Sequence, residues 1–375
     1  MSTSKNGGFL GHGAEESQAR EPFPLPVYDL SGDFERHIVI ERGTPEVYQG
    51  HPTTLLMPDQ KTVFCVWTRN HGGPCGPLKR SDDEGRTWSD LLPVPPDWSG
   101  VRNCPVLFRL PDPQGRYRLF IYAGQGPDGC MHRAVSEDGG ASWSAMESLG
   151  LACVMPFCAI LPRAGGRELV GLTNLRRPGA PAAERTNVLA WSVSRDGGFT
   201  WSPWEIILDW PEKKFCEPWI VVSPDGGEWT TLIRENVHGL SYQIRSRDEG
   251  RTWSDAEPLP VGLAGDRHIS RYAPDGRLVV VFRDRAFNSG TRNHFVAWVG
   301  RYEDLHGGGP GEFRVKLLHS HHGGDCGYPG LECFPDGTFL ATTYIQYRPG
   351  EEKNSIVALR FHLPEFSDPS INRLT

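Results

Sequence analysis

The stretch Ser246-Arg-Asp-Glu-Gly-Arg-Thr-Trp253 decides the fold, because the chain contains its pattern, S-x-D-x-G-x-[ST]-W, four times. The other copies begin at Ser81, Ser136 and Ser194, so successive copies start 55, 58 and 52 residues apart. A repeat of about 50 residues is typical of propellers and solenoids. The repeat therefore indicates a chain built from similar units, each too small to bury a core alone.

Each copy has the chemistry of a tight turn. Ser and Asp side chains can hydrogen-bond nearby backbone groups, and the Gly provides a position that tolerates a positive φ. The closing Trp is large and apolar, so it can hold the turn against the strands behind it. We interpret each copy as a hairpin tip. A ligand or metal site at the four aspartates is the weaker alternative, because four equivalent turns cannot share one pocket; these are Asp83, Asp138, Asp196 and Asp248.

A second, weaker repeat sets the number of units at six. It consists of an apolar stretch, a Pro-Asp turn or a variant, and a run rich in β-branched and aromatic residues, which is typical of strands. The six turn prolines are Pro58, Pro111, Pro162, Pro224, Pro274 and Pro335. The runs that follow them cover residues 62–68, 117–122, 168–173, 229–233, 278–282 and 339–344. We predict an all-β, six-bladed β-propeller with four antiparallel strands in each blade.

The two ends of the chain are expected to complete the ring. Residues 356–363 form a strand of the last unit, and residues 36–41 form a lone strand near the start. We predict that the early strand becomes the outer strand of the last blade, because closure removes free sheet edges. The expected organisation is a disordered segment over residues 1–29 and a single propeller domain over 30–375.

Composition narrows the class of protein. The net charge of −7 argues against nucleic acid as a partner. No run of 18 apolar residues is long enough for a membrane span, and the first twenty residues lack the apolar core of a signal peptide. The nine scattered cysteines suggest reduced thiols and a cytoplasmic protein, or a secreted one if a leader was removed. We expect no metal and no cofactor.

The candidate site follows from the register of the repeat. The residue seven positions before each turn Pro should begin an innermost strand, and in five of the six units a Pro follows it, which a first strand position tolerates. These positions are His51, Cys104, Met155, Glu217, Arg267 and Tyr328. We predict that they form one ring at the mouth of the central channel.

Several arginines are expected at about the same depth of the propeller as this ring. Arg69, Arg234 and Arg283 end second strands, and Arg292 lies just before the run 295–299. Converging arginines suit an anion, because the guanidinium fork matches a carboxylate. A structural alternative is that they form internal ion pairs, such as Arg283 with Asp284 or Asp266.

At this point the chain resembles the sialidase superfamily over about residues 45–365. The four turns are similar to that family's Asp-box repeats, and its fold is a six-bladed propeller. The resemblance implies that Tyr328, in Gly327-Tyr328-Pro329, is a nucleophile and that Glu217 is its partner. It also implies that Arg234 and Arg292 hold a substrate carboxylate.

Two family features are missing. The family's first-blade arginine is replaced by Gln49-Gly50-His51-Pro52, and the loop for its acid/base Asp reads Arg69-Asn70-His71-Gly72-Gly73-Pro74, without a carboxylate. We expect Arg69 to supply the missing charge, with Arg283 assisting, and His71, or otherwise His51, to supply the acid. Histidine titrates near neutrality and can act as a general acid.

The sequence therefore predicts an exo-acting glycoside hydrolase for a terminal acidic sugar, a sialic or related ulosonic acid. Two alternatives stay open. One is a rewired glycosidase or lyase acting on a uronic acid or another sugar. The other is a carbohydrate-binding propeller without catalysis, since propellers host many functions.

Overall fold

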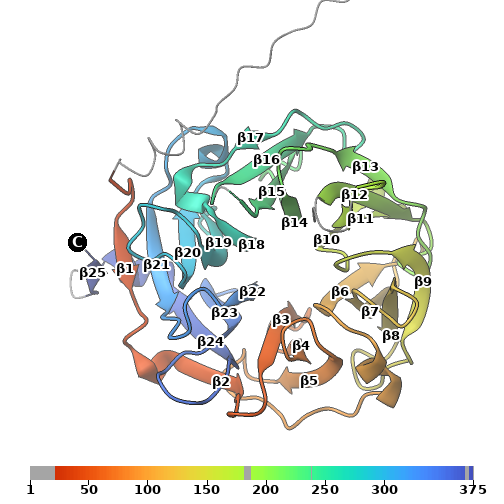
Figure 1. The fold of residues 1–375 in the computed structure, drawn as a ribbon, viewed down its shortest axis with the longest axis horizontal. Helices are drawn as coiled ribbons and strands as arrows, with labels where there is room; N and C mark the ends of the chain where they lie inside the picture. The colour runs from red at the N-terminus through yellow and green to blue at the C-terminus, as the bar shows by residue number, and fades with distance from the viewer. Residues whose placement is uncertain (1–21, 181–186, 238, 368–370, 375) are drawn as a thin grey trace, which may run out of the picture.

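The computed structural model describes residues 22–180, 187–237, 239–367 and 371–374. Its strands form six sheets arranged as blades around a central axis, which confirms the predicted six-bladed β-propeller (Figure 1). Runs of β-branched and aromatic residues between Pro-Asp and Gly turns dictate these strands. The first three blades contain β3 (Gln49–Leu56), β4 (Val63–Arg69) and β5 (Cys75–Ser81); β6 (Val106–Pro111), β7 (Tyr117–Ala123), β8 (Cys130–Ser136) and β9 (Glu147–Ala152); and β10 (Ala159–Arg163), β11 (Glu168–Arg176), β12 (Asn187–Ser194) and β13 (Glu205–Leu208).

The other three blades follow the same antiparallel order from the centre outward. They contain β14 (Phe215–Val222), β15 (Trp229–Glu235), β16 (Ser241–Ser246) and β17 (Glu257–Pro258); β18 (Gly265–Tyr272), β19 (Leu278–Asp284), β20 (Phe295–Gly300) and β21 (Phe313–Leu318); and β22 (Gly327–Cys333), β23 (Thr338–Ile345), β24 (Ser355–His362) and β2 (His37–Glu41). Short 3-10 helices connect some of them: η1 (Phe34–Arg36), η2 (Pro96–Gly100), η3 (Ala164–Gly166), η5 (Val261–Leu263), η6 (Tyr302–His306) and η7 (Leu363–Ser367). No helix in the described ranges is long and apolar enough to cross a membrane.

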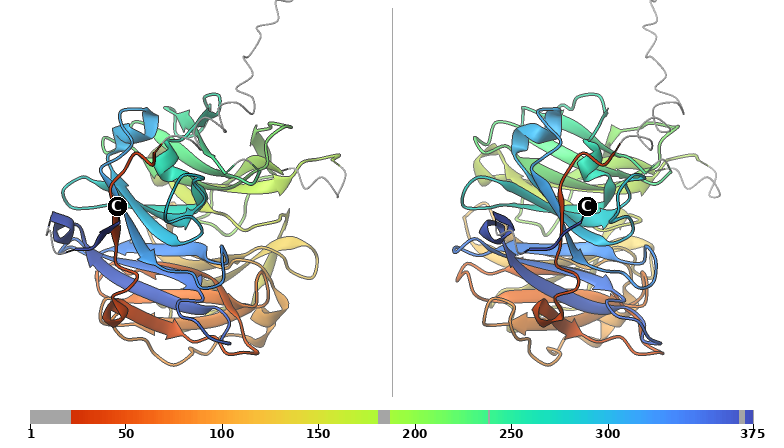
Figure 2. Two further views of the ribbon diagram at one scale, coloured as in Figure 1. Left: turned by 60° about the vertical axis from the view of Figure 1, so that its left-hand side comes forward. Right: turned by 90° about the vertical axis from the view of Figure 1, so that its left-hand side faces the viewer.

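The ring closes as predicted, because β2 pairs antiparallel with β24. The ends of the chain also add two strands that the sequence analysis missed. Strand β1 (Val27–Asp29) runs parallel to β21, and β25 (Arg373–Leu374) pairs with β1, so the fifth sheet has six strands. Figure 2 shows the C-terminus beside this early segment. The segment 1–29, expected to be disordered, is thus regular at Val27–Asp29, and its residues 1–21 lie outside the described residues.

The first blade has three assigned strands instead of the predicted four. The segment after its turn still lies beside β5, because Ser89 N–H donates to Arg80 O and Leu92 N–H donates to Leu78 O, at 2.8 and 2.9 Å. Prolines at 93, 95 and 96 then remove the backbone donors that a longer ladder requires. This segment therefore occupies the position of a fourth strand but lacks the regular hydrogen-bond ladder of one.

The four repeated phrases form the predicted turns. In each turn, the Ser hydroxyl donates to an Asp oxygen at 2.8 Å. The same hydroxyl accepts a hydrogen bond, at 2.8–2.9 Å, from the backbone N–H of the shared Gly four residues after the Ser. That Gly has a φ between 79° and 101° in all four turns, which excludes most other residues. The closing tryptophans pack against the hydrophobic clusters of the blades; they are Trp88, Trp143, Trp201 and Trp253. These aspartates therefore stabilise turns.

Candidate active site

The predicted ring of strand-start residues carries strained backbone. Five of its six members have a positive φ between 46° and 57°: His51, Cys104, Glu217, Arg267 and Tyr328. This conformation has an unfavourable free energy for non-glycine residues, and it is concentrated at functional sites. The strands β3, β14, β18 and β22 also shift register at these points, and such bulges re-aim side chains. The local fold therefore turns these side chains toward one another; Met155 is the member without a positive φ.

Tyr328 and Glu217 form the centre of the site. The Tyr328 hydroxyl donates a short hydrogen bond to Glu217 Oε1, across 111 residues of sequence. Arg234 Nη1 donates to both oxygens of the same carboxylate, at 3.1 and 2.9 Å. The backbone N–H of Glu217 donates to Asn174 Oδ1 at 3.0 Å, which supports the bulged strand end. A buried carboxylate is thus held against a phenol in a fixed geometry.

The charges of this pair follow from its surroundings. Burial alone would raise the pKa of the Glu217 carboxyl, but the guanidiniums of Arg234 and Arg267 outweigh it and lower the pKa to about 2. Burial and the neighbouring Glu217 carboxylate raise the pKa of the Tyr328 hydroxyl well above its ordinary value. The resting site therefore contains an ionised Glu217 and a neutral Tyr328.

Two histidines follow Tyr328 in a stack, because His51 packs against Tyr328 and His71 packs against His51. The His51 ring lies 4.2 Å from the Tyr328 ring and 4.5 Å from the His71 ring, measured between centroids. Burial, followed by repulsion from His71, lowers the pKa of His51 to about 3. His51 Nδ1 is 3.2 Å from Cys104 Sγ, and its Nε2 is buried without a hydrogen-bond partner. His51 is therefore a neutral imidazole, and because its Nδ1 accepts a hydrogen bond from the Gly72 N–H at 3.3 Å, the ring proton lies on Nε2.

His71 lies at the mouth of the site, with 63% of its side chain exposed. Its Nδ1 is 3.4 Å from the Tyr48 hydroxyl and 3.8 Å from Asp325 Oδ1. Asp325 is fixed in turn by the Tyr48 hydroxyl at 3.0 Å and by Asn354 Nδ2 at 3.1 Å from Oδ2. An exposed imidazole next to an anchored carboxylate can give a proton to a ligand at the mouth.

The arginine cluster differs from the predicted anion site. Arg234 and Arg283 do converge, but on the protein's own Asp266, whose side chain is 6% exposed. Arg234 Nε lies 2.9 Å from Asp266 Oδ1, and Arg283 Nε donates to Oδ2 at 2.8 Å. The ion-pair alternative is thus correct for Asp266, whereas Asp284 pairs with Arg314 at 2.9 Å. Asp266 and Arg283 lie opposite each other on β18 and β19, whereas Arg234 reaches Asp266 from the neighbouring blade.

The remaining predicted arginines are placed differently. The Arg267 guanidinium is buried over the Tyr328 ring, 5.6 Å from its centroid, so it belongs to the centre of the site. Arg69 is exposed and lines a surface pocket with Pro95 and Trp98 beside η2. Arg292 stacks over Phe287 at 4.6 Å. The predicted role of Arg69 in place of the missing family arginine stays a prediction.

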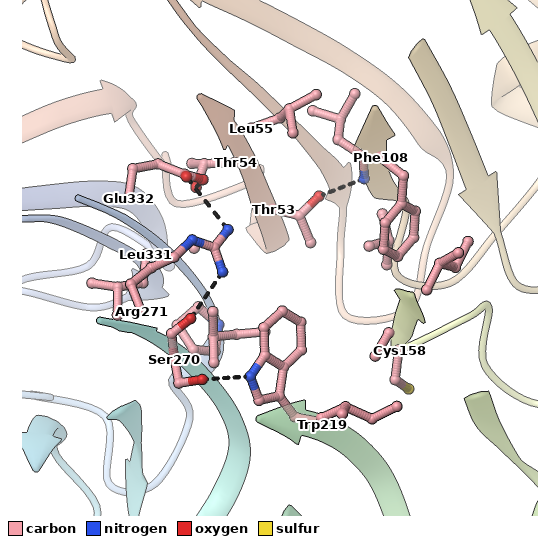
Figure 3. Close-up of a pocket in the computed structure, with 18 of the residues that line it drawn as sticks. Thr53, Thr54, Leu55, Phe108, Cys158, Trp219, Ser270, Arg271, Leu331 and Glu332 are labelled. Atoms are coloured by element: carbon pink, nitrogen blue, oxygen red, sulfur yellow. Dashed lines mark hydrogen bonds and ion pairs between the residues drawn. The ribbon is translucent and has the colours of Figure 1, made fainter. Parts of the chain in front are cut away.

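A cavity of about 420 Å³ lies along the central axis, further along the innermost strands. Figure 3 shows Arg271 between Glu332 and Ser270, with Trp219 nearby. Arg271 Nη2 is 3.4 Å from Glu332 Oε2, and Trp219 Nε1 donates to Ser270 Oγ at 2.8 Å. These polar groups bond to one another, and Arg267 also lines the cavity, so the cavity adjoins the centre of the site.

Several site residues escaped the sequence analysis as functional candidates. Asp266 directly precedes the ring member Arg267, and Asp325 comes three residues before Tyr328; adjacency to the ring was the signal available for both. Asn174 and Tyr48 had no such signal, because strands distant in sequence bring them to the site. In the parts of the chain that are described, no three His, Cys, Asp or Glu side chains are grouped to hold a metal ion.

Comparisons with known proteins place this geometry in context. Residues 101–340 match the family of BNR repeat-like domains. A protein of unknown function from Dyadobacter fermentans has a similar structure, with 17% identity, a TM-score of 0.67, and coverage of 87% of this chain and 97% of that one. The NanB sialidase of Streptococcus pneumoniae is similar at 13% identity and a TM-score of 0.56, covering 88% and 71%.

The intramolecular trans-sialidase of Ruminococcus gnavus gives the same TM-score and identity, with coverage of 88% of this chain and 97% of that one. No curated protein sequence matches significantly. At these identities the structural likeness concerns the fold alone. The family match spans most of the propeller, including Glu217, Arg234, Asp266 and Tyr328. The chain belongs to the family of BNR repeat-like domains, with a sialidase-like six-bladed propeller.

Proposed function

We propose that the protein is an exo-acting glycoside hydrolase in which Tyr328 is the nucleophile and Glu217 its base. The observation that carries the proposal is the hydrogen bond from the Tyr328 hydroxyl to Glu217, made by two strained strand starts. Holding a nucleophile and its base in contact is the general signature of covalent catalysis. The partner is accordingly a carbohydrate with a terminal sugar.

In the first step, Tyr328 Oη bonds to the anomeric carbon while its proton passes to Glu217. The bond to the leaving-group oxygen breaks, and that oxygen takes a proton from His71. Because the pKa of Glu217 is about 2, the proton moves as the new C–O bond forms and the phenol becomes more acidic. Arg234 and Arg267 keep Glu217 ionised and ready to accept.

In the second step, water attacks the anomeric carbon of the glycosyl-tyrosine. His71 takes the proton from that water, and the Tyr328 oxygen leaves and recovers its proton from Glu217. Two displacements at one carbon retain its configuration. The short distances support this cycle, because the rings of His71 and Tyr328 both pack against His51, at 4.5 and 4.2 Å between centroids.

A release assay tests the proposal. Fluorogenic glycosides of sialic and other ulosonic acids, uronic acids and neutral sugars are incubated with wild-type protein, Glu217→Gln and Glu332→Gln. Glu332 is the matched control, because it is a buried glutamate of the channel that does not contact Tyr328. The proposal expects release by wild type, loss of about 100-fold or more in Glu217→Gln and little change in the control. Tight glycan binding without release would contradict it and favour a sugar-binding protein.

A further inference from the structure

The cavity on the central axis has a largely apolar wall. The innermost strands of all six blades line it, mainly with Leu, Ile, Val, Phe and Trp side chains. Figure 3 shows the half-buried rings of Trp219 and Phe108 among them. Cavities of about 300–1,000 Å³ with apolar walls and few polar groups are typical of sites for small molecules. At about 420 Å³, this cavity has the size and the lining of such a site.

The charged side chains of the cavity do not balance one another. Four of them line it, namely Arg109, Arg267, Arg271 and Glu332. The Glu332 carboxylate is already paired, because it accepts from Thr54 Oγ1 at 2.7 Å and from Arg271 Nη2 at 3.4 Å. The Arg109 guanidinium lies over the Tyr117 ring, 3.7 Å from its centroid. Three guanidiniums thus line the cavity with one carboxylate.

Arg267 is the lining arginine whose donors are least satisfied. Its side chain is 2% exposed, and its Nη1 is buried without a hydrogen-bond partner. The neighbouring Glu217 carboxylate accepts from Arg234 Nη1 and from the Tyr328 hydroxyl. A buried donor without an acceptor is rare and has an unfavourable free energy. The lining of the cavity therefore includes a buried cation that suits an acceptor from a ligand.

The surrounding charges favour an anionic acceptor over a neutral one. Next to the ring of strand starts, four guanidiniums face two carboxylates. The arginines are Arg234, Arg267, Arg283 and Arg285, and the carboxylates are Glu217 and Asp266. A low-dielectric interior strengthens the attraction of this excess positive charge for a negative group. The planar guanidinium fork matches a carboxylate best.

We infer that the cavity binds a small apolar carboxylate, whose charged group pairs with Arg267 and whose hydrocarbon part lies against Trp219 and Phe108. A sugar is a poorer occupant, because its many hydroxyls would find few free partners on the apolar wall. The inference goes beyond the proposed function and does not depend on it. Arg267 lines the cavity, whereas Glu217 and Tyr328 do not.

The test compares aryl carboxylates with their own amides, which have nearly the same shape but no charge. Benzoate, phenylacetate, 3-phenylpropionate and 2-naphthylacetate, and the four corresponding amides, are titrated by calorimetry up to about 10 mM. The proteins are wild type, Arg267→Met and Trp219→Leu. One control is Arg109→Met, a lining arginine stacked on Tyr117, and the other is His71→Ala, at the mouth of the active site. Circular dichroism checks that each variant is folded.

We expect at least one acid to bind wild type with a Kd below about 1 mM, and its amide to bind at least about tenfold more weakly. Arg267→Met should abolish this preference for the acid. Trp219→Leu should weaken the acid and the amide alike, and both controls should bind as wild type does. If Arg267→Met does not fold, the ratio of acid to amide and Trp219→Leu decide.

Three results would overturn the inference: no binding of any acid, equal binding of acid and amide, or binding that is lost in a control but kept in Arg267→Met. Because no glycoside is used, each of these results leaves the proposed hydrolase standing. Conversely, a protein that releases no sugar but binds an acid through Arg267 would lack the proposed activity and retain the cavity site.

Discussion

Replacing Arg234 with methionine tests the electrostatic account of the site. Arg234 bridges Glu217 and Asp266, whose side chains are 4% and 6% exposed, so its loss leaves two buried carboxylates with fewer partners. Removing one member of a buried ion pair costs about 3–5 kcal/mol of unfolding free energy. Arg234, Arg267 and Tyr328 together lower the pKa of Glu217 from 4.5 to about 2, which corresponds to about 3 kcal/mol at neutral pH and sets an upper limit for the share of Arg234 in that shift. We therefore expect Arg234→Met to reduce the free energy of unfolding by about 3 kcal/mol.

The loss of unfolding free energy in Arg234→Met should become smaller as the pH falls. The folded-state pKa of Glu217 lies below its unfolded value, so its contribution is present above about pH 5 and disappears as pH falls toward about 2. The difference between wild type and Arg234→Met should consequently narrow by about 1 kcal/mol between pH 7 and pH 4. The narrowing grows if the pKa of Glu217 in the variant rises above its ordinary value.

Urea denaturation at both pH values measures these differences, provided that refolding is reversible. Arg247→Met is the matched control, because Arg247 also pairs with a glutamate, at 2.7 Å, but is 79% exposed. A surface pair of this kind contributes less than about 1 kcal/mol. A loss below about 1 kcal/mol in Arg234→Met, or a loss that is the same at both pH values, would refute the reasoning.

Two further predictions concern the histidines. His71→Ala should slow release of alcohol leaving groups by about 100-fold, but should affect activated phenol leaving groups much less, since these need no proton; equal losses for both, measured as kcat/KM, would exclude His71 as the acid. The pKa of His51 is lowered to about 3, so its ring should stay neutral between pH 5 and 8; NMR titration of the imidazole signals checks this, and a midpoint above about 5 would disprove it.

The sequence predicts the ring of blades and the ring of strand starts because both depend on local, periodic signals. Turn chemistry repeats every 50 to 60 residues, and counting back from the turn proline finds Glu217 and Tyr328 directly. The structure brings these two into contact although 111 residues separate them. Both residues lie at the same place in the repeat, at the bulged start of an innermost strand.

The partner of Arg234 could not be predicted in this way. Arg283 lies opposite Asp266 in one hairpin, so the strand register predicts that pair. Whether Arg234 meets Asp266 depends on how side chains from neighbouring blades face each other, which no spacing along the chain records. Arg69 shares its position at the end of a second strand with them, yet it lies beside η2. The strands β1 and β25 are three and two residues long, too short for an alternating pattern to reveal.

The most direct test of the central claim is turnover by Tyr328→Phe on the glycoside that wild type releases fastest. Tyr272→Phe is the control, because its hydroxyl donates to Val222 O in the channel at 2.8 Å, away from Glu217. The account predicts a loss of about 1,000-fold or more in kcat for Tyr328→Phe with substrate binding retained. It also predicts that a fluorinated sugar that slows the second step leaves a covalent adduct on Tyr328, found by peptide mass spectrometry. Turnover of Tyr328→Phe within about tenfold of wild type, or an adduct on another residue, would contradict the account.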